Sequence, residues 1–220
     1  MRYLLLFASV LLLAACAGQR TQLNGDLRAQ PAWFSAGKIA LHDDDRHTTL
    51  RFSWQQHYDD YQLTLNGSFG LGALTITKKK GLIRLWKGRI SSAQQRLIAP
   101  LDSADSAEQL LETHTGLRFP LSLLRYWATG QPAPGHAYRT LTSATDTNTA
   151  TETGLRNFQQ AGWHIQYVRA FDTDDQRASL PKKMRIEKRE QRIIIAFSNW
   201  SVTSTDHDHA HAHAHAHAHE

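Results

Sequence analysis

The residue with the most specific chemistry is Cys16, the single cysteine of the chain. It follows Leu13-Ala14-Ala15, and small residues before a cleavage point let a signal peptidase accept the extended chain. A cysteine at the first mature position can carry an S-diacylglyceryl group and an N-acyl group, and this spacing is a lipobox. The sequence therefore predicts a lipid anchor on Cys16. The alternative is an ordinary secretory signal with an incidental cysteine.

Residues 1–15 have the composition of a signal peptide. Arg2 gives a short positive region, and the apolar run 4–13 is shorter than the ~20 residues that cross a bilayer. Ala17 follows the cysteine, where an aspartate would retain a lipoprotein in the inner membrane under the enterobacterial-type sorting rule. We therefore expect a lipid-anchored protein on the periplasmic face of the outer membrane.

The carboxyl-terminal residues 204–220 form a His/Ala-rich tail, which we expect to be disordered. Neutral imidazole is a common transition-metal ligand, so a flexible tract of this kind can bind Zn²⁺, Ni²⁺ or Cu²⁺. The alternative is a low-complexity repeat without selected function, and no metal site is certain. The imidazoles are those of His207, His209, His211, His213, His215, His217 and His219.

Composition narrows the class of protein. The chain has 220 residues, 41% of them hydrophobic, which suits one domain with a sizeable core. Lipidation uses the only cysteine, so no intramolecular disulfide is available. The net charge of +5 is densest at 78–80 and 182–192, and a periplasmic address favours anionic lipid over nucleic acid as its partner. Solvated turns and strand faces explain the charge equally well.

Alternating apolar and polar residues predict a strand-rich domain over 32–203, preceded by a flexible tether at 16–31. One example is Leu50, Phe52 and Trp54, which alternate with polar residues. The predicted strands lie within 50–54, 61–66, 73–77, 82–86, 163–167, 184–186 and 193–202.

Two helices interrupt the strands. Asp105 and Glu108 have capping-box-like spacing, and Gly116 is a plausible end to that helix. Pro120 can begin a second helix that ends before Gly130. Residues 144–153 are rich in Thr, Asp and Asn and predict a long mobile insertion.

Strands, then helices, then strands predict one antiparallel sheet curled around the helices. Its apolar face would border either a packed core or a hydrophobic cavity. Sequence patterning does not distinguish the two, and composition favours the core.

The order and spacing of several segments resemble the LolB family of outer-membrane lipoprotein receptors. The resemblance extends from about residue 33 to 202. The segments that carry it are RFSWQQ at 51–56, NGSFG at 66–70, GLRFPLSLLRYW at 116–127, GW at 162–163, LPKKM at 180–184 and IIIAFSNW at 193–200.

This resemblance implies an incomplete, open antiparallel β-barrel with a helical lid over an apolar cavity, as in LolA and LolB. It implies a monomer that takes acylated lipoproteins from a LolA-like periplasmic carrier. The cargo would be placed in the inner leaflet of the outer membrane, in contact with its phospholipid. No nucleotide is required, and the chain has no phosphate-binding G-x-x-x-x-G-K-[ST] motif.

The loop at 66–72 carries a more specific expectation. Phe69, Gly70 and Leu71 follow an Asn-Gly turn in a glycine-rich stretch where burial is difficult. In the family a protruding leucine in this loop passes lipoproteins into the membrane, and Phe69 is at the matching position. The alternative is that Phe69 folds back onto the barrel edge.

The resemblance also suggests which side chains line the cavity, although plain core packing is the alternative for each. A one-residue slip in strand parity would move a set to the other face. The candidates are Phe52, Trp54, Leu65, Trp86, Leu124, Trp127, Trp163, Tyr167, Met184, Ile186, Ile195 and Phe197.

Two other functions remain open: a metal-binding lipoprotein, which depends on the tail alone, and a periplasmic lipid hydrolase. The chain lacks the G-x-S-x-G nucleophile elbow and the βα alternation that supports it. We therefore expect a protein that is not an enzyme and that needs no cofactor apart from the lipid on Cys16.

Overall fold

The computed structural model describes residues 32–43, 46–67, 72–141, 155–171 and 180–202. The lipidation site Cys16, the loop residues Phe69 to Leu71, the insertion at 144–153 and the histidine tail lie outside these described residues. The described strands form one open antiparallel sheet, and two α-helices lie against one of its faces. This confirms the predicted fold, mainly β with helices.

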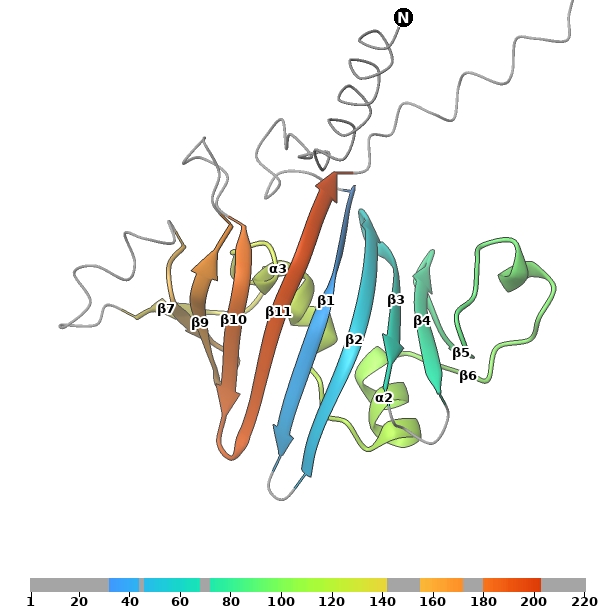
Figure 1. Cartoon of the computed structure of the whole chain (residues 1–220), viewed down its shortest axis with the longest axis horizontal. Coiled ribbons are helices and arrows are strands. Elements are labelled where there is room, and N and C mark those ends of the chain that lie inside the picture. Colours follow the sequence, from blue (N-terminus) through green and yellow to red (C-terminus); the bar gives the residue numbers. More distant parts are fainter. Residues whose placement is uncertain (1–31, 44–45, 68–71, 142–154, 172–179, 203–220) are drawn as a thin grey trace, which may run out of the picture.

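The strands follow the chain in two runs that meet at the centre of the sheet (Figure 1). Their spatial order is β6-β5-β4-β3-β2-β1-β11-β10-β9-β8-β7, so the first and last strands of the domain pair with each other. The strands are β1 (Ala32–Asp43), β2 (Arg46–His57), β3 (Asp60–Asn66), β4 (Ala73–Lys79), β5 (Leu82–Lys87), β6 (Asp102–Ala104), β7 (Tyr138–Thr140), β8 (Phe158–Gln160), β9 (Trp163–Ala170), β10 (Pro181–Lys188) and β11 (Gln191–Val202).

Period-two alternation decides which side chains face the core. On β2, Leu50, Phe52 and Trp54 are buried, whereas Arg51 between them is exposed. Successive strand side chains point to opposite faces, so such a pattern buries one face of the sheet and exposes the other. In β10 and β11, Met184, Ile186, Ile193 and Ile195 continue the same apolar face.

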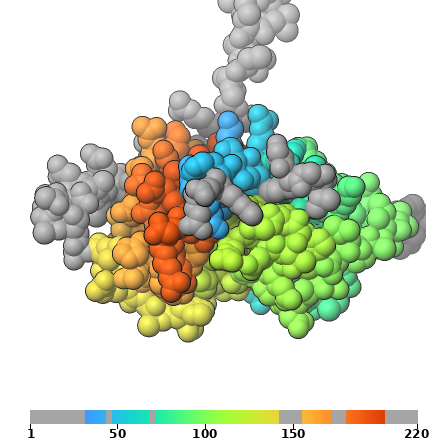
Figure 2. Space-filling model, turned by 90° about the horizontal axis from the view of Figure 1, so that it is seen from below, coloured from blue at the N-terminus to red at the C-terminus, as the bar shows by residue number. Residues whose placement is uncertain are grey.

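The helices α2 (Ala107–Thr115) and α3 (Leu121–Trp127) cover this apolar face (Figure 2). The N-cap of α2 is Ser106, whose hydroxyl accepts the Gln109 amide, so the cap is one residue later than the predicted Asp105. Gly116 ends α2 with φ of 70°, a left-handed conformation that favours glycine. Within the described ranges, no helix is long and apolar enough to cross a membrane.

A bulge in the central β1–β11 pair shifts the register between Ala36 and Gly37. Ala36 pairs with Asn199 and Gly37 with Phe197, so Ser198 is the extra residue. A Cβ at position 37 would lie 2.0 Å from the Ala196 carbonyl oxygen. The backbones approach so closely here that only glycine fits.

Gly37→Ala should therefore destabilise the domain by about 2 kcal/mol or more, because the new methyl group forces the two central strands apart. Urea denaturation measures the loss. Ala40→Gly, in the same strand beyond the bulge, is the control and should cost about 1 kcal/mol or less. Equal effects of the two changes would show that the close approach at Gly37 is not a constraint.

Candidate functional site

The apolar space between sheet and helices is the candidate site. Eleven of the twelve predicted lining residues lie in one buried cluster there, with Met184 and Ile186 fully buried. They come from both halves of the sheet and from α3. The eleven are Phe52, Trp54, Leu65, Leu124, Trp127, Trp163, Tyr167, Met184, Ile186, Ile195 and Phe197.

Trp86 is the exception, and the structure places it on the opposite face of the sheet. It pairs with Thr75, and its indole Nε1 donates to the Thr77 hydroxyl at 3.1 Å. The neighbouring Leu85 is the residue of β5 that faces the helices with the core. Both faces of the sheet are buried at this point, so Leu85 and Trp86 are both inaccessible to solvent although they point to opposite faces. Apolar character therefore did not show which of the two faces the helices.

The aromatic part of the site is larger than predicted. Trp33 lies between Trp54 and Trp200, with ring centroids 5.3 and 5.2 Å apart, and Phe197 lies 4.8 Å from Trp200. Trp200 was missed because the bulge at Ser198 reverses the alternation of β11. Its indole Nε1 donates to the Pro181 carbonyl at 3.1 Å, which gives its only polar atom a partner.

Side chains fill the interior in this structure. Phe52, Phe119 and Phe197 meet Leu124 and Ala128 around a space of about 10 Å³. A space of this size holds about one water molecule and no acyl chain. A bulky apolar ligand can therefore enter only if the helices and the sheet separate.

Buried hydrogen bonds attach the carboxyl-terminal end of α3 to the sheet. The Trp127 indole Nε1 donates to Gln160 Oε1 at 2.8 Å, and the Tyr167 hydroxyl donates to the Trp127 carbonyl at 2.8 Å. Gln160 also accepts the Ala133 amide and donates to the Ala133 carbonyl. Breaking these bonds would leave buried polar groups unpaired, which is costly. The side of α3 that carries Trp127 is therefore firmly held.

A carboxylate joins the two helices. Glu108 of α2 accepts the Ser122 amide at 2.7 Å and the Ser106 hydroxyl at 2.9 Å. Burial alone would raise the pKa of Glu108, but the hydrogen bonds from Ser122 and Ser106 hold it below its ordinary value. The two helices therefore form a connected unit over the sheet.

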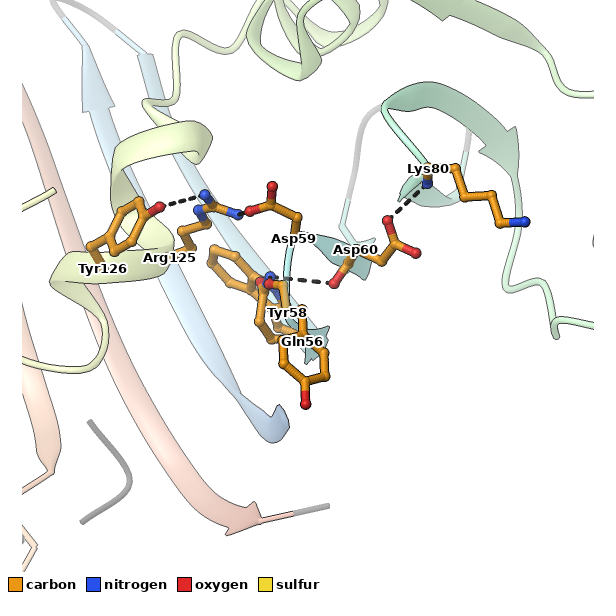
Figure 3. A network of polar contacts seen from close by, with 8 residues as sticks. Gln56, Tyr58, Asp59, Asp60, Lys80, Arg125 and Tyr126 are labelled. Atoms are coloured by element: carbon orange, nitrogen blue, oxygen red, sulfur yellow. Dashed lines mark hydrogen bonds and ion pairs between the residues drawn. The ribbon is translucent and has the colours of Figure 1, made fainter. Parts of the chain in front are cut away.

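A second attachment of α3, on another side of the same last turn, is more exposed (Figure 3). Arg125 donates to the Asp59 carboxylate at 2.7 Å and also to the Tyr126 hydroxyl. The Asp59 side chain is 76% exposed and the Arg125 side chain 19%. Exposed ion pairs contribute at most about 1 kcal/mol, so this contact is easier to break than the buried bonds at Trp127.

The turn that carries Asp59 is itself well fixed. The Gln56 amide donates to the carbonyls of Tyr58 and Asp60 at 2.6 and 3.2 Å, and the Asp60 carboxylate accepts the Lys80 amide at 2.8 Å. The turn therefore supplies a rigid partner, and any opening at this edge must come from α3. No three His, Cys, Asp or Glu side chains in the described part of the chain are grouped to hold a metal ion.

The Asp59–Arg125 contact gives a pH-dependent prediction. The hydrogen bond and charge of Arg125 hold the pKa of Asp59 below its ordinary value. The contact is therefore complete above that ordinary value and is lost as pH falls through the lowered pKa. Asp59→Asn should raise access of a hydrophobic dye to the interior at neutral pH by up to about fivefold, the equivalent of about 1 kcal/mol.

The difference between wild type and Asp59→Asn should vanish in acid, where both lack the charged contact. Glu112→Gln is the matched control, because the exposed Arg118–Glu112 pair at 3.0 Å does not join a helix to the sheet. A dye signal that responds equally to both substitutions would contradict a role for Asp59 in holding α3.

The sequence is similar to known proteins over most of its length. The family model described as Outer membrane lipoprotein LolB matches residues 31–200. Outer-membrane lipoprotein LolB of Halorhodospira halophila is 29% identical over 77% of this chain and 75% of its own length. The protein of the same name from Cellvibrio japonicus is 29% identical over 80% of both chains.

Among solved structures, the LolA superfamily protein NE2245 from Nitrosomonas europaea has a TM-score of 0.48 and 9% identity, over 80% of this chain and 88% of that chain. The family match extends over almost all the described residues, from β1 to β11. The chain therefore belongs to the LolB family of outer-membrane lipoproteins.

Proposed function

We propose that this protein receives acylated lipoproteins from a LolA-like periplasmic carrier and inserts them into the inner leaflet of the outer membrane. The observation that carries the proposal is the apolar interior, which lies between a curled sheet and a pair of helices with one weakly held edge. Membership of the LolB family supports the same role.

The cargo explains why such an interior is needed. Burial of an acyl chain contributes ~0.8 kcal/mol per methylene. Exposing the acyl chains of a lipoprotein to water therefore costs on the order of tens of kcal/mol, so they cannot leave a membrane unshielded. Aromatic rings and Met184 suit the role, because thioether and ring surfaces adapt to flexible chains. The bilayer is the most favourable final site for the chains, so delivery requires no nucleotide.

The closed interior describes the receptor without cargo. If α3 separated from the sheet in water, it would expose Phe52, Trp54 and Phe197, which line one space with Leu124 of α3. Incoming acyl chains can replace those lost contacts, so cargo itself favours the open state. We infer that α3 moves away on the side that carries Arg125 while the side that carries Trp127 stays attached.

A transfer experiment tests this role. The mature protein with Cys16→Ala should take a lipoprotein from its complex with the carrier, in the absence of nucleotide, because the interior receives the acyl chains and the anchor only confines the receptor. Co-purification of cargo with this protein measures the transfer. The same cargo without its acyl chains is the control and should remain unbound; equal capture of both forms, or no transfer, would overturn the proposal.

We propose that the loop at 66–72 delivers the cargo to the bilayer. This loop connects Asn66, the last residue of β3, to Ala73, the first residue of β4, and these two residues pair with each other. Phe69→Glu should accept cargo normally but release it into liposomes at least tenfold more slowly, because a carboxylate resists entry into lipid. Phe69→Leu is the matched control and should keep the wild-type rate. A normal release rate for Phe69→Glu would end the insertion hypothesis.

A further inference from the structure

The segment between β5 and β6 presents large apolar side chains to solvent. Leu97, Ile98 and Leu101 are 85%, 53% and 47% exposed. They follow the 3-10 helix η2 (Gln94–Arg96), which projects from the β5–β6 edge of the sheet, far from β7 (Figure 1). Three large apolar side chains exposed together in one segment suggest a contact surface.

Hydrogen bonds hold this segment in place. It begins where the Gly88 amide donates to the Ala73 carbonyl at 2.6 Å, and it ends where the Leu101 amide donates to the Leu85 carbonyl at 2.7 Å. Between them, Gln62 on β3 donates to the Ile90 carbonyl at 3.1 Å and accepts from Gln95 at 2.8 Å.

The side chain of Ile90 is buried and anchors the segment to the rest of the domain. The segment is therefore fixed, and its other large apolar side chains point toward solvent. The exposure of Leu97 and Ile98 is a property of the fold and not of a frayed end.

The charge of the same segment has one sign. Lys87, Arg89 and Arg96 are exposed, and no acidic residue occurs between Lys87 and Leu101. Apolar side chains beside basic ones are the combination that binds the interface of an anionic bilayer. The chain belongs to a family of outer-membrane lipoproteins, so a bilayer is the nearest surface that offers both properties.

We propose that residues 87–101 form a second membrane contact, which binds the surface of a bilayer that contains anionic phospholipid. Leu97, Ile98 and Leu101 enter the interface, while Arg89 and Arg96 bind phosphate groups. Gly88, near the start of this segment, lies beside Ala73, the first residue of β4. The contact does not depend on the proposed cargo role, because it involves the empty protein and lipid alone.

Vesicle flotation of the mature protein with Cys16→Ala tests the contact without the lipid anchor. The wild-type surface should bind vesicles of phosphatidylethanolamine and phosphatidylglycerol. The triple substitution Leu97→Ser, Ile98→Ser and Leu101→Ser should lower the partition coefficient at least tenfold. Arg89→Gln and Arg96→Gln should each lower it about fivefold on anionic vesicles, the equivalent of about 1 kcal/mol per charge. The arginine substitutions should have little effect on phosphatidylcholine vesicles.

The control removes exposed apolar groups from the other half of the sheet, through Val168→Ser and Tyr138→Ser, which are 44% and 58% exposed. These changes should leave binding unchanged. The proposal would be overturned if the triple variant kept the wild-type partition coefficient, or if the control variant lost as much vesicle binding as the triple variant. Unchanged vesicle binding together with loss of carrier binding would also overturn it and assign the segment to a protein contact.

Discussion

The need to hide the apolar face of one sheet from water determines most of this structure. A single-layer sheet with one apolar face is not stable alone, and here the helices α2 and α3 cover it. The central β1–β11 pair joins the two ends of the domain and allows both halves of the sheet to share this cover. Residues as distant as Trp33 and Trp200 therefore pack ring against ring.

Two sides of the last turn of α3 are held to the sheet with different strength. At Trp127 the hydrogen bonds to Gln160 and Tyr167 are buried, and their loss would leave polar groups without hydrogen-bond partners in an apolar interior. At Arg125 the partner is an exposed carboxylate, for which water can substitute at little cost. A lid with one firmly held side and one weakly held side can open without detaching. The proposed receptor requires this property, since its site must be closed when empty and accessible to acyl chains.

Several features were predictable because they depend on local chemistry. Alternation located the long strands other than β1, which was not predicted, since a half-buried strand repeats every two residues. Gly116 marked the end of α2 through its left-handed backbone. The short strands β6, β7 and β8 were not predicted, because three residues are too few to show a period. The N-cap was misplaced by one residue, since Asp105 and Ser106 are both suitable capping residues.

The sequence by itself determined the strand-rich class and most of the apolar residues of the interior, because these depend on residue type and short-range spacing. The signal peptide and the lipobox at Cys16 stay predictions from the sequence. Only the tertiary structure decided that Trp86 lies on the outer face and that Trp200 turns inward, because parity depends on which strands pair and where a bulge falls. It also decided that Arg125 meets Asp59 and that side chains fill the interior. Contacts between residues far apart in the chain and the space left between packed side chains follow from the folded arrangement, and no local pattern encodes them.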